Sequence, residues 1–100
     1  MKTTIKERTA EMLRAALDLA NVTSWQALTH DSIARKAGVS ASLVKVRLGS
    51  IATVRQAVMR EAVKQRVVRV VAEGLAVRNR TARRADASLR AECGEWVAGA

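Results

Sequence analysis

Cationic and hydroxyl side chains gather between Thr29 and Leu48, in the stretch THDSIARKAGVSASLVKVRL. Lysine and arginine can donate hydrogen bonds to guanine O6 and N7, serine can bond several base edges, and small apolar side chains can contact the thymine methyl group. The segment is therefore a candidate for contact with double-stranded DNA. Its candidate contact residues are Ser40, Ala41, Ser42, Leu43, Lys45, Val46 and Arg47. Lys45 could instead bind a backbone phosphate, and residue type alone leaves both roles open.

Thr29 and His30 stand at the start of the first helix expected in this stretch. Helix N-termini attract phosphate through their free N–H groups and the positive end of the helix dipole. Thr29 and His30 are therefore candidate phosphate clamps, although Thr29 could be a plain helix cap and His30 a solvated side chain. His30 is the only histidine, so it cannot build a metal site without other ligands.

Two short helices must position these side chains. We expect one over residues 30–37, capped by Thr29 and ended by Gly38 at positive φ, and a second over residues 41–48, capped by Ser40. Their apolar residues are spaced to meet in one small core: Ile33, Ala34, Ala37, Val39, Val44 and Leu48. This spacing is typical of a helix-turn-helix, whose second helix enters the major groove of DNA.

The run IARKAGVSASLVKVRLGS resembles the helix-turn-helix of TetR-type bacterial transcription regulators, whose pattern is roughly IA-x-x-AGVS-x-g-t-l-Y-x-y-F-x-s-K. Ile33-Ala34 and the run from Ala37 to Ser40 match that pattern directly. Upstream, Met12-Leu13 and the apolar residues up to Leu19 stand where the family has its first-helix core. The resemblance covers about the first 60 residues and implies an all-α, homeodomain-like DNA-binding domain.

The chain departs from the family pattern at three positions. Lys45 replaces the usual tyrosine, Arg47 replaces an aromatic residue, and Ile51 replaces a lysine. Lys45 and Arg47 could supply the lost phosphate-binding charge from within the helix. Family members usually continue into a domain that encloses a ligand and forms a dimer interface, so here the resemblance implies DNA binding without a small-molecule ligand.

The composition supports a helical, nucleic-acid-binding chain. There is no proline, phenylalanine or tyrosine in the 100 residues, and the core must be built mainly from alanine and branched aliphatic residues. The formal net charge is +9, which favours anionic partners, although a purely solubilising surface is the alternative. One histidine, one cysteine and no glycine-rich loop argue against an enzyme and against a cofactor. The sequence contains no apolar run long enough for a membrane span and no secretion signal, so we expect a cytoplasmic, nucleoid-associated protein.

Outside the motif the sequence predicts further helices. Thr4 can cap a helix that ends near Ala20, and Trp25 should pack in the core beneath the motif. Ser50 should begin a long helix reaching about Arg78, so that residues 1–50 form the DNA-binding region and residues 51–100 complete the core. Asp86 can cap a last helix. A basic run connects the two, Arg78, Arg80, Arg83 and Arg84, and could be a solvated turn or a second phosphate contact.

The predicted long helix carries two apolar stripes. One can close the core of the motif, whereas the other would need cover from the C-terminal helix or from a second copy of the chain. We therefore expect a homodimer joined through the second stripe and the last helix. The expected interface residues are Met59, Val63, Val67, Val70, Val71, Leu89 and Trp96.

These observations favour a sequence-specific, homodimeric DNA-binding regulator of transcription, with repression as the expected action. A small helical adaptor or antirepressor that binds another protein is the first alternative. A DNA-architectural or replication accessory protein is the second. Salt dependence of DNA binding separates the adaptor from the other two, because phosphate contacts release counterions.

Overall fold

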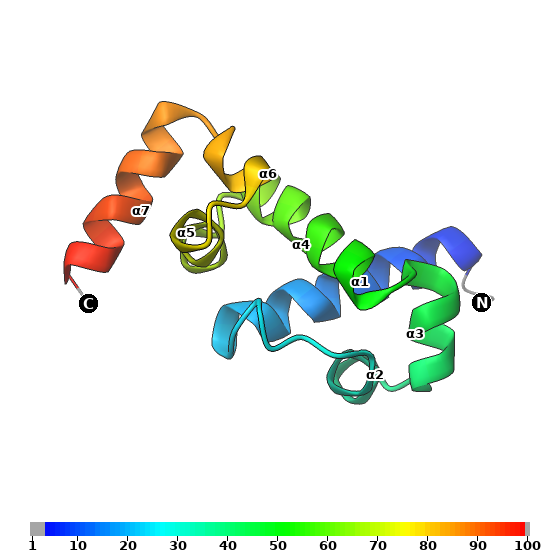
Figure 1. Ribbon diagram of the computed structural model, residues 1–100. Coiled ribbons are helices and arrows are strands. Elements are labelled where there is room, and N and C mark those ends of the chain that lie inside the picture. The colour runs from blue at the N-terminus through cyan, green and yellow to red at the C-terminus, as the bar shows by residue number, and fades with distance from the viewer. Residues whose placement is uncertain (1–3, 100) are drawn as a thin grey trace.

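The computed structural model describes residues 4–99, which form seven α-helices and no strand, so the predicted all-α class is confirmed (Figure 1). The helices are α1 (Ile5–Val22), α2 (His30–Ala37), α3 (Ala41–Leu48), α4 (Ile51–Gln65), α5 (Val68–Ala76), α6 (Arg80–Arg83) and α7 (Ala87–Gly99). The first helix runs two residues further than expected, and α2 and α3 have the predicted bounds.

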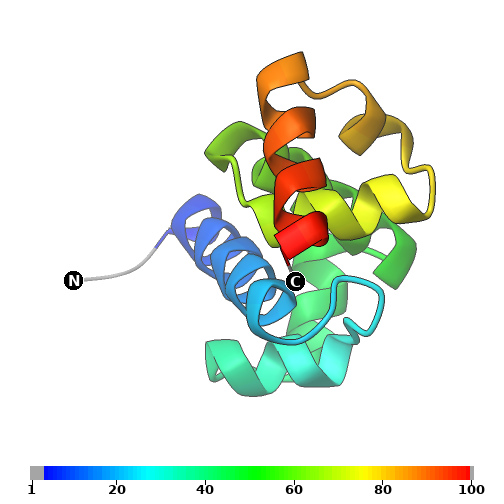
Figure 2. The ribbon, with the colours of Figure 1, turned by 90° about the vertical axis from the view of Figure 1, so that its left-hand side faces the viewer.

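The helices form two groups along the long axis of the molecule. The first group is α1, α2, α3 and the start of α4, and the second is the end of α4 with α5 and α6 packed around it. α7 packs mainly on α5, at the opposite end of the molecule from α3 (Figures 1 and 2). One continuous apolar core joins the two groups across the predicted boundary at residue 50.

Side-chain caps begin most of the helices where the sequence predicts them. The Thr29 hydroxyl accepts the Ser32 N–H at 3.0 Å, and Ser32 Oγ accepts the Thr29 N–H at 3.1 Å, so the two residues form a reciprocal capping box. Ser40 accepts the Leu43 N–H at 3.1 Å, and Asp86 accepts the Leu89 N–H at 2.7 Å. This backbone hydrogen bond is the main reason that the pKa of Asp86 is lowered.

The turn between α2 and α3 has the expected left-handed residue. Gly38 has φ of +72°, and the next residue donates its N–H to the Ala34 carbonyl at 3.0 Å. Beneath the turn Ile33, Ala34 and Val44 are buried, as predicted, whereas Ala37, Val39 and Leu48 are only partly buried against the same core.

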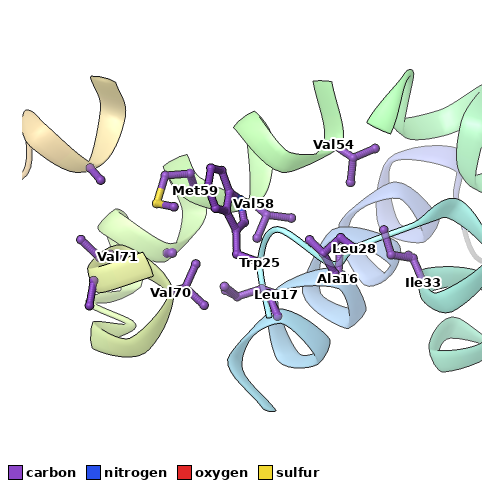
Figure 3. Close-up of a cluster of buried hydrophobic side chains, with 14 of the residues drawn as sticks. Ala16, Leu17, Trp25, Leu28, Ile33, Val54, Val58, Met59, Val70 and Val71 are labelled. Carbon is purple, nitrogen blue, oxygen red and sulfur yellow. The ribbon is translucent and has the colours of Figure 1, made fainter. Parts of the chain in front are cut away.

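Trp25 lies in the middle of the core, as the sequence predicts (Figure 3). Its indole Nε1–H donates to the Arg55 carbonyl at 2.8 Å, so the ring is buried with its one polar group satisfied. Leu17 from α1 and Val58 from α4 lie beside it, and Val70 lies on the α5 side (Figure 3). The core therefore needs only this one large side chain to bridge three helices.

The prediction of one long helix from Ser50 to Arg78 is wrong. α4 ends at Gln65, because Arg66 adopts a left-handed conformation with φ of +57° and the Val67 N–H turns back to the Ala62 carbonyl at 2.8 Å. The Arg66 guanidinium supports this turn by pairing with Asp86 at 3.1 Å and with Glu92 at 3.0 Å. No glycine or proline marks the break, and the two acidic partners are 20 and 26 residues away.

The break changes where the second apolar stripe lies. Because α5 folds back against α4, Met59, Val70 and Val71 have no exposed surface, and Leu89 from α7 is equally buried. These four residues were predicted to form a dimer interface, and that prediction is wrong because the single chain already covers them. Val63 and Val67 are partly buried in the same core. Of the predicted interface only Trp96 is well exposed, at 45%.

Glu73 ties α5 to the loop between α1 and α2. Its carboxylate accepts hydrogen bonds from the Ser24 hydroxyl at 2.8 Å, from the Trp25 N–H at 2.9 Å and from the Gln26 N–H at 2.7 Å. Arg69, one turn earlier, donates to the Thr23 carbonyl at 2.9 Å. α5 therefore satisfies several of the loop's polar groups, while the Ala27 and Leu28 N–H groups bond to carbonyls within the loop.

Glu73→Ala should lower the free energy of unfolding by about 1–3 kcal/mol, because it leaves the partly buried Trp25 N–H and Ser24 hydroxyl without their acceptor. Thermal denaturation followed by circular dichroism measures the change. Glu95→Ala is the matched control, since Glu95 is exposed on α7 and should change stability by less than about 0.5 kcal/mol. Equal melting temperatures for the two variants would show that Glu73 does not hold the loop.

Gly38→Ala should destabilise the chain by about 1–2 kcal/mol, because its φ of +72° is strained for any residue with a Cβ. Gly94→Ala provides the same chemical change inside a helix, where alanine is favoured by about 1 kcal/mol. An added Cβ meets no atom within 4 Å at either position, so the backbone conformation alone decides whether each substitution raises or lowers stability. The midpoint of chemical denaturation should fall for Gly38→Ala and rise for Gly94→Ala. A shift of both midpoints in the same direction would contradict the assigned turn.

Candidate functional site

The starts of α2 and α3 open onto one shared hollow of about 370 Å³. It is lined by Thr29, His30, Asp31, Ala41, Ser42 and Lys45. Five of these six residues were candidate contact residues, and the fold brings them together from two helices. Asp31 was not predicted, and its carboxylate would oppose an anion placed directly over it.

The first residues of both helices line this hollow. Thr29 caps only the third residue of α2, and Ser40 caps only the third residue of α3. The first N–H groups of a helix have no partner within the helix, and they point out of its N-terminal end. The N-terminal turns of both helices line the hollow, so the positive ends of two helix dipoles lie beside it, which suits an anion at its rim.

One face of α3 is open to solvent beside the hollow. Ser42, Lys45 and Val46 are all exposed, and positions three and four apart lie on the same side of a helix. Val46 is 71% exposed, so its side chain is free to meet a ligand. Ala41 and Leu43 are partly buried at the edges of this face, and Ser40 serves as the cap.

Arg47 is less available than the sequence predicts. Its side chain is partly buried, and its Nε has no exposed surface and no hydrogen-bond partner among residues 4–99. Lys45 is exposed, and both ion pairs recorded among the described residues belong to Arg66, so Lys45 makes no direct ion pair there, although Asp31 lines the same hollow. Of the two cations predicted on α3, Lys45 is the better placed to meet a ligand.

His30 has a structural contact that the sequence did not indicate. Its Nε2 lies 2.8 Å from the Gly49 carbonyl oxygen, so the ring is partly buried and donates from that nitrogen. The interpretation of His30 as a solvated side chain is therefore wrong, whereas its backbone N–H still lies at the start of α2. The contact joins the start of α2 to the α3–α4 turn, 19 residues away.

Arg55 is a second positioning residue that sequence reasoning missed. Its Nη2 donates to the Leu28 carbonyl at 3.3 Å, just before α2, and its own carbonyl accepts from Trp25. Thus α4 holds the segment that leads into α2 at two points. Long-range contacts of this kind leave no pattern in the sequence, because neither residue belongs to the motif.

Other types of site have little support in the described part of the chain. No group of three or more histidine, cysteine or acidic residues that could hold a metal occurs within residues 4–99. Cys93 is buried on α7, and desolvation raises its pKa, as expected for an unreactive packed thiol. None of the helices in residues 4–99 is long and apolar enough to cross a membrane.

Comparison of the chain with protein-family models, with curated proteins and with solved structures gives no match.

Proposed function

We propose that this protein binds double-stranded DNA through a TetR-like helix-turn-helix formed by α2 and α3, and that it represses transcription. The observation that carries the proposal is the hollow where Thr29 and His30 of α2 meet Ala41, Ser42 and Lys45 of α3, beside the exposed face of α3. The resemblance of this segment to TetR-type regulators supports the same interpretation and extends over about the first 60 residues.

The proposed docking mode places α3 in the major groove. A helix with its side chains is about 10–12 Å wide, which matches the groove width of about 12 Å. Lys45 would donate to guanine O6 and N7, and Ser42 would bond a neighbouring base edge. Val46, being exposed, would contact a thymine methyl group.

Phosphate contacts would come from the start of α2. Its unpaired N–H groups and dipole suit a backbone phosphate at the rim of the hollow, while Asp31 disfavours one at its centre. His30 would act indirectly, by holding α2 against the α3–α4 turn. The net charge of +9 would add a long-range attraction that weakens as salt is added.

We place the proposed homodimer contact at the α5–α7 end. Trp96 and Val97 are 45% and 58% exposed there, next to an apolar hollow of about 380 Å³. That hollow is lined by Ala72, Leu75, Ala76, Arg90, Cys93, Gly94 and Val97. A two-fold axis through this end would leave both copies of α3 free to contact half-sites about 34–36 Å apart. The same exposed face is what favours the alternative function, a helical adaptor for another protein.

Lys45→Ala should weaken binding to the preferred duplex by about 1–3 kcal/mol, because it removes a base contact. The preferred duplex is first selected from a random pool, and affinities are measured by fluorescence anisotropy. Lys64→Ala is the matched control, since Lys64 is equally exposed but lies near the end of α4. The proposal fails if both variants bind like the parent, or if no sequence is enriched from the pool.

Trp96→Glu should separate the proposed dimer without unfolding the chain, because the side chain is already 45% exposed in one copy. Sedimentation velocity at micromolar concentration should give twice the chain mass for the parent and the single mass for the variant. Ile5→Glu, at an exposed apolar residue on α1, is the control and should stay dimeric. A monomeric parent chain would refute this assembly and favour binding to a single half-site.

A further inference from the structure

Four arginines surround the short helix α6 and form a cluster that the α2–α3 site does not use. Arg78, Arg80, Arg83 and Arg84 are all exposed and line a hollow of about 440 Å³. We call these four residues the α6 arginine cluster. Four positive charges thus occur within seven consecutive residues, with Asn79, Thr81 and Ala82 between them.

The backbone that carries the cluster is fixed by its contacts with the core and with α4. Ala82 is fully buried and Ala85 nearly so, and the Asn79 side chain accepts the Ala82 N–H at 3.1 Å. Gln56 of α4 donates to the Thr81 hydroxyl at 3.0 Å. α6 therefore has a fixed inner face, and the arginines project from a rigid turn.

α5 packs closely against α4 and α6 just before the turn that leads into the cluster. At Gly74 of α5 an added Cβ would collide with the Met59 methyl carbon and lie 3.0 Å from the Ala82 Cβ. Arg78 has a left-handed φ of +59°, and Asn79 returns its N–H to the Gly74 carbonyl at 2.8 Å. The chain is thus bent sharply just where the arginines begin.

No acidic side chain balances the cluster in the described part of the chain. Asp86 is the nearest acid in sequence, but its carboxylate pairs with Arg66 at 3.1 Å. Both recorded ion pairs involve Arg66, and none involves the cluster. Four like charges held on one rigid turn repel each other, and an anionic ligand would relieve this repulsion.

We propose that the α6 arginine cluster is a second binding site for the phosphodiester backbone of nucleic acid. Guanidinium groups present planar pairs of donors that match phosphate oxygens. A membrane surface fits less well, because Asn79, Thr81 and Ala82 offer no large apolar side chain to enter the acyl region, and Val77, 45% exposed beside the cluster, is a single valine. This inference goes beyond the proposed function, since it holds whichever helix reads the base sequence.

The cluster lies away from the α2–α3 site. In both views α6 lies in the upper part of the molecule and α2 at the bottom (Figures 1 and 2), and Figure 1 shows α4 between them. The phosphates that it binds could come from a flanking part of the same duplex or from a second duplex. Both sources present the same phosphodiester groups. Only the second would let one protein molecule bridge two separate duplexes.

The test compares the full chain with Arg80→Gln/Arg83→Gln on a random-sequence duplex of about three helical turns. The variant should bind less tightly, and its slope of log affinity against log salt should be shallower by about 2, since about 0.9 is expected for each lost phosphate contact. Arg14→Gln/Lys36→Gln removes the same charge from a hollow that Glu7, Glu11 and Asp18 also line, and it should keep the parent slope.

Further arms identify the source of the phosphates. If the difference in salt slope between the parent and the glutamine variant disappears on a duplex of about one helical turn, the cluster binds the flank of the same duplex. If two differently labelled duplexes show energy transfer with the parent and lose it with the cluster variant, the cluster binds a second duplex. Arg80→Lys/Arg83→Lys should keep the salt slope, which guards against a folding defect in the glutamine variant.

The inference is overturned if the cluster variant keeps the parent affinity and slope, or if it changes binding only to anionic phosphatidylserine vesicles. The ratio of affinities for selected and random duplexes separates this result from the helix-turn-helix proposal. The cluster variant should leave that ratio unchanged, whereas Lys45→Ala should lower it. The salt slope therefore tests the cluster, the affinity ratio tests the helix-turn-helix, and either proposal can fail while the other holds.

Discussion

The left-handed turn at Arg66 is the constraint on which the rest of the structure depends. It ends α4 and sends α5 back along the same core, so that Met59, Val70 and Val71 are covered within one chain. Arg66 also binds the start of α7 through Asp86 and Glu92. Because the returning α5 carries Glu73, this single reversal also decides how the loop before α2 is held.

Three polar side chains outside the exposed face of α3 hold the segments around the α2–α3 site. Glu73 holds residues 24–26, Arg55 holds Leu28, and His30 holds the α3–α4 turn. None of these side chains belongs to the exposed face of α3, so the face is positioned by residues that need not touch a ligand. A ligand that binds there would therefore meet a surface with little remaining freedom to lose.

The local parts of the fold could be predicted from the sequence, whereas the long-range parts could not. Thr29, Gly38 and Ser40 act through neighbours three or four residues away, so their types alone predicted α2, the turn and α3. Arg66 and Glu73 act on partners 20 to 49 residues away, and an arginine in a left-handed turn carries no sequence signal. The predicted dimer stripe was misplaced for this reason, since its burial depended on a turn that no residue type indicated.

Because one chain buries its own core, the occupancy of a proposed two-fold DNA site would depend on protein concentration in a particular way. The single chain buries Met59, Val71 and Leu89 by itself, so the pairing proposed through Trp96 would be a reversible equilibrium and not a condition for folding. At concentrations below the pairing constant, the amount of paired protein rises with the square of the total. Occupancy of a two-fold site would then change steeply over a narrow range of expression, and dilution alone would release it.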